Sequence, residues 1–177
     1  SKIASGSHDD VVTFWDIPQG NVVKRLQGHK NSVLSVKWSP DGKQIASGSG
    51  DKSVRTWNFE NSSTDQVYEG HGDDVRAVDW SPNGKMIASG GSDNNLNIWD
   101  AATGQMIFSV SGHTNLISSV CWNPASDKIA TGSWDHTIKI WNANNGSLIR
   151  TLTGAGGAVY DVDWSPDGNK IVAGIGD

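Results

Sequence analysis

Short runs of alternating hydrophobic and polar residues, separated by turn residues, dominate the chain. Residues 75–80 read Val-Arg-Ala-Val-Asp-Trp and are followed by the turn Ser-Pro-Asn-Gly. Further short runs follow at residues 86–90, 96–99 and 105–110, with Gly, Asn, Asp or Thr between them. Alternation with a period of two predicts β-strands, and short polar turns favour antiparallel hairpins. Because no stretch has a convincing helical period, the sequence predicts an all-β fold with essentially no helix.

The same pattern returns every 42 residues without insertion or deletion. The Gly-His pairs that begin at Gly28, Gly70 and Gly112 keep this step, with Gly154-Ala155 as the fourth member. A fixed period of this length is typical of stacked units that cannot bury their apolar faces alone. Four strands of about five residues and four similar turns fill one period, which predicts a four-stranded meander. Two sets of tryptophans recur with the same spacing of 42 residues: Trp15, Trp57, Trp99 and Trp141, and Trp38, Trp80, Trp122 and Trp164. One set of aspartates does so as well: Asp9, Asp51, Asp93, Asp135 and Asp177.

Several short motifs recur together in the periods. They are Gly-His, Ser-Pro-Asp-Gly, Ile-Ala-Ser-Gly-Ser-x-Asp and a strand that ends in Trp-Asp or Trp-Asn. With these motifs along its whole length, the chain resembles the WD-repeat family of β-propellers. The resemblance implies that each period is one blade, with strands a to d ordered from the central channel outward. The tryptophans that end strand a are then expected to pack between neighbouring blades or under the Ser-Pro-Asp-Gly turn.

The phase of the repeat divides the chain into complete and partial blades. Residues 27–69, 70–111 and 112–153 are expected to form complete blades, whereas 1–26 lacks the innermost strand and 154–177 lacks the outer two. Joining the two partial blades would place strand b twice in one sheet. We therefore expect an excerpt of a longer ring of about seven blades, the usual number implied by the resemblance. The alternative is a part-propeller of which two copies assemble.

A His-Ser-Asp combination recurs and could suggest nucleophilic catalysis. A catalytic serine must face a cleft, but this combination occurs once in every complete blade. The resemblance implies a buried hydrogen-bonded tetrad instead, in which Trp57 donates to Ser47, Ser47 bonds His29, and His29 bonds Asp51. The expected tetrads are His29, Ser47, Asp51 and Trp57; His71, Ser89, Asp93 and Trp99; and His113, Thr131, Asp135 and Trp141. The last blade has alanine at the His and Ser positions, so packing is expected to hold it.

Composition narrows the classes of ligand. The net charge is −5, which gives no electrostatic reason to bind nucleic acid directly or an anionic membrane. No run of 18 apolar residues occurs, and no basic-then-apolar segment opens the printed sequence, so we expect neither a membrane span nor a leader. The single cysteine, Cys121, can form neither an internal disulfide nor a Cys-based metal cage, and the tetrad histidines lie on separate blades. We therefore expect no metal, no cofactor and a cytoplasmic or nuclear location.

The resemblance also implies where partners bind. In WD-repeat propellers the usual platform is the face that carries the d-to-a and b-to-c loops. Trp134 breaks the 42-residue register, because the equivalent positions hold His, Gly, Ser and Gly. Arg, Trp and Tyr dominate binding hot spots, so we expect a partner patch centred on Trp134, Tyr160 and Arg76. The alternative is that Trp134 only covers a neighbouring loop. The expected platform residues are Trp134, Tyr160, Arg76, Leu34, Leu116, Asp74, Ser118 and His8.

The leading expectation for function is a non-catalytic scaffold that binds protein or peptide segments as a subunit of a multiprotein complex. No acid pair or nucleophile stands outside the tetrad positions, which disfavours intrinsic catalysis. The alternative is a sensor or substrate-recruiting module of a larger enzyme or signalling protein. A third class is small-molecule or carbohydrate binding in the central channel.

Overall fold

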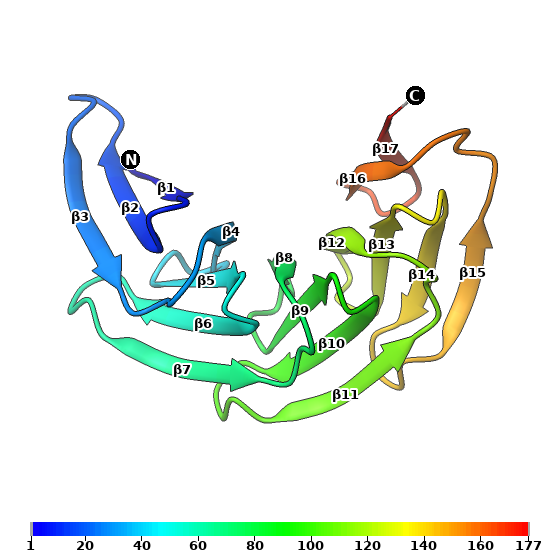
Figure 1. The fold of residues 1–177 in the computed structure, drawn as a ribbon, viewed down its shortest axis with the longest axis horizontal. Helices are drawn as coiled ribbons and strands as arrows, with labels where there is room; N and C mark the ends of the chain where they lie inside the picture. Colours follow the sequence, from blue (N-terminus) through cyan, green and yellow to red (C-terminus); the bar gives the residue numbers. More distant parts are fainter. Residues whose placement is uncertain (1, 177) are drawn as a thin grey trace.

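The computed structural model describes residues 2–176, which form seventeen β-strands in five antiparallel sheets (Figure 1). The sheets follow one another along an open arc. In each sheet that has strand a, this strand lies on the concave side, and strand d lies on the convex side where present (Figure 1). The predicted all-β fold, with blade-like sheets at a 42-residue repeat, is confirmed. No helix occurs between residues 2 and 176, and hence none that could cross a membrane.

Each sheet is a simple meander in which strands that are neighbours in the chain pair side by side. The first sheet contains β1 (Lys2–Gly6), β2 (Val11–Asp16) and β3 (Val22–Gln27). The second contains β4 (Val33–Trp38), β5 (Gln44–Ser49), β6 (Ser53–Asn58) and β7 (Thr64–Glu69). The third contains β8 (Val75–Trp80), β9 (Met86–Gly91), β10 (Asn95–Asp100) and β11 (Met106–Ser111). The fourth contains β12 (Ile117–Trp122), β13 (Lys128–Ser133), β14 (Ile138–Asn142) and β15 (Leu148–Leu152), and the fifth contains β16 (Val159–Trp164) and β17 (Ile171–Ile175).

The hydrophobic core lies between consecutive sheets, in contacts that we call seams. At the seam between the second and third sheets, Val54 and Tyr68 pack in one cluster with Val75, Ile87 and Trp99 of the following sheet. Similar clusters of buried residues fill the other seams. Apolar residues alternate along each strand, so both faces of an inner sheet are buried only when it has a neighbour on each side.

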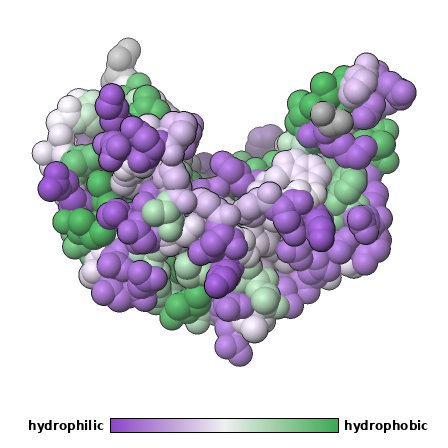
Figure 2. Space-filling model, turned by 180° about the vertical axis from the view of Figure 1, so that it is seen from behind, coloured by the Kyte–Doolittle hydropathy of each residue, from purple (hydrophilic) through white to green (hydrophobic). Residues whose placement is uncertain are grey.

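Equivalent residues at the end and in the middle of the arc show how strongly a neighbouring sheet buries a side chain. The side chain of Trp15 in the first sheet is 38% exposed, whereas Trp57 at the same position of the second sheet is 1% exposed. Trp57 packs against Val12 and Phe14 of the preceding sheet. Figure 2 shows the same trend on one face, because hydrophobic surface gathers toward the two ends and the middle is largely hydrophilic.

Glycine in strand b allows the sheets to approach closely. A Cβ atom added at Gly90 would lie 2.4 Å from Cγ2 of Ile117 and 2.9 Å from Cγ1 of Val120, both in the next sheet. Such distances are too short for carbon atoms, so the next sheet occupies the space of this side chain. At Gly174, the equivalent position in the fifth sheet, the nearest atom to an added Cβ is 3.9 Å away.

Candidate functional site

A chain of hydrogen bonds crosses each complete sheet from strand c to the b-to-c turn. In the second sheet, Nε1 of Trp57 donates to Oγ of Ser47 at 2.8 Å. Ser47 Oγ lies 2.7 Å from Nε2 of His29, and Nδ1 of His29 lies 2.8 Å from Oδ2 of Asp51. An indole nitrogen only donates, so Ser47 accepts from Trp57. With a neutral imidazole, the serine hydroxyl donates to Nε2 and Nδ1–H donates to the carboxylate.

The third and fourth sheets repeat this geometry. In the fourth sheet threonine replaces serine. The shortest distance of each Trp–hydroxyl, hydroxyl–His and His–Asp contact lies between 2.7 and 2.9 Å. The two tetrads are Trp99, Ser89, His71 and Asp93, and Trp141, Thr131, His113 and Asp135. The hydroxyl-bearing residues are fully buried. A buried hydroxyl whose bonds are satisfied inside the sheet offers no nucleophile to a substrate. The tetrads thus have the geometry of structural networks.

Burial and hydrogen bonding lower the pKa values of histidine and aspartate in the tetrads of the second and fourth sheets. Desolvation lowers the pKa of both His29 and His113 below the ordinary 6.5, although the nearby aspartates oppose this shift. Burial alone would raise the pKa of Asp135, but hydrogen bonds from Thr137 and His113 offset it and lower the pKa to about 2. The pKa of Asp51 is lowered by the same balance. A neutral histidine therefore donates to an ionised aspartate.

These shifts predict that the protein loses stability as the pH falls from 7.5 to 5.5. The unfolded chain binds protons at His29 and His113 near pH 6.5, whereas the folded chain resists them because burial lowers both pKa values. The free energy of unfolding must then decrease as the pH falls through 6.5. The urea concentration at which half of the protein is unfolded, determined at pH 7.5 and at pH 5.5, measures this change. A midpoint that is unchanged or higher at pH 5.5 would contradict the neutral tetrads.

Six of the eight expected platform residues line one surface hollow of about 240 Å³, which we call the loop-face hollow. They come from four consecutive sheets and lie in or beside the first strand of each, or in the b-to-c turn of the fourth sheet. The lining residues are Leu34, Arg76, Leu116, Ser118, Trp134 and Tyr160. Five of them are uncharged, so Arg76 supplies the formal charge of the hollow.

The two aromatic rings of this hollow contact each other across the last seam. The ring centroids of Trp134 and Tyr160 are 5.6 Å apart in an edge-to-face arrangement. The residues nevertheless remain 38% and 53% exposed, respectively. Tyr160 also covers Gly176, where an added Cβ would lie 2.4 Å from Cε2 of the tyrosine. Trp134 thus lies beside the ring of the next sheet and keeps part of its surface open to solvent.

Arg76 is held at the rim of the loop-face hollow. Its Nε donates to Oγ of Ser92 at 2.8 Å, and its Nη2 lies 3.6 Å from Oδ2 of Asp74. Asp74 therefore stands beside the hollow as the partner of the arginine. This exposed ion pair is weak, so the guanidinium can bond a further acceptor.

Two expected platform residues make further contacts in the structure. His8 is exposed but does not line the hollow, and its Nδ1 lies 2.8 Å from Oγ of Ser32 at the first seam. Ser118 lines the hollow, but its hydroxyl donates to the backbone oxygen atoms of Gly132 and Val159. Its hydroxyl thus links the fourth and fifth sheets, and its contribution to the hollow is one of shape.

Sequence reasoning missed a carboxylate that links three sheets on the concave side. Oδ2 of Asp79 accepts the backbone N–H of Trp122 at 2.9 Å, and Oδ1 lies 3.4 Å from Nζ of Lys37. Burial raises the pKa of Asp79. The available signal was a pair of opposite charges separated by one period. Burial also raises the pKa of the neighbouring Cys121 thiol to about 12, so it is no nucleophile at neutral pH.

Within residues 2–176, no group of three or more His, Cys, Asp or Glu side chains is placed to hold a metal ion.

Comparison with known proteins agrees with this geometry. Residues 1–165 match a family model described as the WDR19 first beta-propeller. Coronin-7 of Rattus norvegicus is 46% identical over 43 residues, which are 24% of this chain and 5% of that protein. Ribosome assembly protein 4 of Chaetomium thermophilum is 44% identical over 45 residues, or 25% of this chain and 9% of that protein. Transcription initiation factor TFIID subunit 5 of Caenorhabditis elegans is 46% identical over 43 residues, or 24% and 7%.

These three matches are each about one repeat long, so the chain spans only a small part of these relatives. The family model, in contrast, covers four consecutive repeats. Together with the stacked four-stranded sheets, this match shows that the chain belongs to the WD-repeat β-propeller family.

Proposed function

We propose that this chain is a non-catalytic scaffold that binds a protein or peptide segment in the loop-face hollow. WD-repeat propellers commonly bind proteins and are generally non-catalytic. The observation that carries the proposal is the hollow itself, in which Trp134, Tyr160 and Arg76 converge from three different sheets. Trp, Tyr and Arg are the residue types that contribute most to protein interfaces.

The dimensions of the hollow favour a side chain of a partner over a cofactor. Its volume of about 240 Å³ is below the roughly 300–1,000 Å³ of most pockets for small molecules. An apolar side chain placed there would cover the exposed edges of Trp134 and Tyr160 and contact Leu116. Rigid strands hold these residues, so the partner meets a surface that needs little ordering.

The names of two relatives support a role in an assembly. One is a ribosome assembly protein, and the other is a subunit of a transcription initiation factor. Our proposal for this chain is accordingly a subunit of a multiprotein complex in the cytoplasm or nucleus. The net charge of −5 gives no general attraction to nucleic acid or anionic lipid, so the proposed partners are proteins or peptides.

The double substitution Trp134→Ala and Tyr160→Ala tests this proposal. Each residue is expected to act as a hot spot worth about 2 kcal/mol, so each loss weakens binding about 30-fold. The measurement is quantitative affinity capture, followed by titration of the captured partner. Ile149→Ala is the matched control, because it removes an exposed apolar side chain from the outer strand β15.

The proposal requires that partners retained by the wild type and by Ile149→Ala are lost from the double variant. Unchanged urea midpoints would show that all three proteins are folded alike. Equal capture by the folded double variant would remove the loop-face hollow as the binding site.

A further inference from the structure

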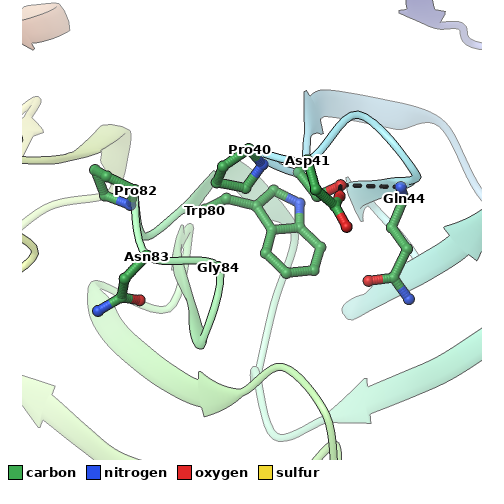
Figure 3. Close-up of a pocket in the computed structure, with 8 residues that line it drawn as sticks. Pro40, Asp41, Gln44, Trp80, Pro82, Asn83 and Gly84 are labelled. Atoms are coloured by element: carbon green, nitrogen blue, oxygen red, sulfur yellow. Dashed lines mark hydrogen bonds between the residues drawn. The ribbon is translucent and has the colours of Figure 1, made fainter.

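A second hollow lies at the opposite ends of the strands, where the a-to-b turns of the second and third sheets meet. It encloses about 230 Å³, and we call it the turn-face hollow. Figure 3 shows Trp80 between the two turns, with the nitrogen-bearing edge of its ring directed toward Asp41. The lining residues are Ser39, Pro40, Asp41, Gln44, Trp80, Pro82, Asn83 and Gly84.

The indole of Trp80 is an unpaired donor at this hollow. The residue is 5% exposed, and its Nε1 has no hydrogen-bond partner among residues 2–176. At the next seam, the equivalent Trp122 donates its Nε1–H to the backbone oxygen of Asp79 at 3.2 Å. A buried donor without a partner costs about 1–3 kcal/mol. Nε1 of Trp164, at the same position of the fifth sheet, is also unpaired among residues 2–176. At Trp80 the unpaired donor borders the turn-face hollow, which an acceptor from outside the described chain can enter.

One of the residues that differ between the two seams is at position 84 and its equivalent, 126. Ser126 in the fourth sheet accepts the backbone N–H of Asn83 with its Oγ at 3.2 Å, which bridges the seam between the third and fourth sheets. Gly84 holds the equivalent position in the third sheet, and no atom lies within 4 Å of an added Cβ there. Both residues have a positive φ, 71° for Gly84 and 61° for Ser126. The turn-face hollow is thus open where the other seam has a serine side chain.

Asp41 provides an acceptor beside the Trp80 donor. Its Oδ1 accepts the hydroxyl of Ser39 at 2.6 Å and the backbone N–H of Lys43 at 3.1 Å, which leaves Oδ2 to a further donor. The same two hydrogen bonds lower the pKa of Asp41, so the carboxylate is ionised at neutral pH. A ligand must therefore accept a hydrogen bond at Trp80 and donate one at Asp41.

We propose that the turn-face hollow binds the side-chain carboxamide of an asparagine or glutamine from a partner protein. The carboxamide oxygen accepts from Nε1 of Trp80, and its NH₂ group donates to Asp41. Pro40 and Pro82 also line the hollow. A lysine or arginine would pair with Asp41 but offer no acceptor to Trp80. A carboxylate would accept from Trp80 but be repelled by Asp41.

The indole N–H signals of the ¹⁵N-labelled chain provide the test. The signal of Trp80 is assigned with the Trp80→Phe variant, and the chain is titrated with N-acetylglutamine methylamide. The corresponding alanine and arginine derivatives are titrated in two parallel control experiments. The alanine compound tests the main-chain amides alone, because it has no side-chain carboxamide. We expect a saturable shift of the Trp80 signal with the glutamine compound alone, while the Trp122 signal does not move.

Two substitutions at the equivalent positions 84 and 126 provide a second test. Gly84→Ser fills the hollow and is expected to weaken binding at least tenfold, whereas Ser126→Gly leaves it unchanged. The backbone tolerates this exchange, because Ser126 already has the required positive φ. Unaltered indole signals elsewhere report that each variant is folded.

Three outcomes overturn the proposal. The first is no shift of the Trp80 signal with the glutamine compound, which would mean that water alone satisfies the Trp80 donor. The second is an equal or larger shift with the alanine or arginine compound. The third is unchanged binding of the glutamine compound by Gly84→Ser. The loop-face hollow plays no part in this site, so Trp134→Ala must leave the titration unaltered.

Discussion

Trp99→Ala is expected to lower the free energy of unfolding by about 3–5 kcal/mol. The ring is fully buried and packs edge-to-face on Tyr68 of the preceding sheet, with 5.5 Å between ring centroids. Its Nε1 also donates to Ser89 at 2.8 Å, so the substitution leaves both a cavity and an interrupted tetrad. Trp99→Phe keeps most of the ring and removes the donor, and is expected to cost about 1–2 kcal/mol.

Trp15→Ala is the matched control for this prediction. Trp15 has the same position in its repeat and donates to Ser5 at 3.0 Å, but its side chain is 38% exposed. Its removal is expected to cost about 1 kcal/mol, because less apolar surface leaves contact with the protein. Urea denaturation of the three variants measures the differences. Equal losses for Trp15→Ala and Trp99→Ala would contradict the view that the preceding sheet buries this position.

The period and the turn residues were sufficient to predict the sheets. The run predicted at residues 75–80 is the whole of strand β8, and that at 86–90 is β9 without its last residue. Alternation fixes which residues lie in a strand, and Gly, Pro, Asn and Asp mark where it ends. Repetition also predicts the arrangement of the sheets, because similar units that cannot bury their own faces must stack on one another.

Contacts between repeats were harder to predict. Trp134 was recognised because its size breaks the pattern, but its contact with Tyr160 depends on how two side chains lie across a seam. The repeat rule assigns His8 to the same platform, which stays a prediction; His8 bonds Ser32 at the first seam and does not line the loop-face hollow. Ser126 carried a signal as a serine among turn glycines, but its partner across the seam is visible only in the structure.

Gly90→Ala is expected to lower the free energy of unfolding by about 1–3 kcal/mol. The added Cβ would lie 2.4 Å from Ile117 and 2.9 Å from Val120, so strands of adjacent sheets would have to separate. Gly174→Ala makes the same chemical change at the equivalent position of the fifth sheet, where the nearest atom is 3.9 Å away. Its effect is expected to stay within about 0.5 kcal/mol.

The unfolding free energies of Gly90→Ala and Gly174→Ala test most directly whether each 42-residue repeat is a blade that packs face to face on the next. Both hollows depend on this stacking, because residues of different repeats line each of them. The account predicts a clear loss of stability for Gly90→Ala and almost none for Gly174→Ala. Equal losses in the two variants, or no loss at Gly90, would contradict it.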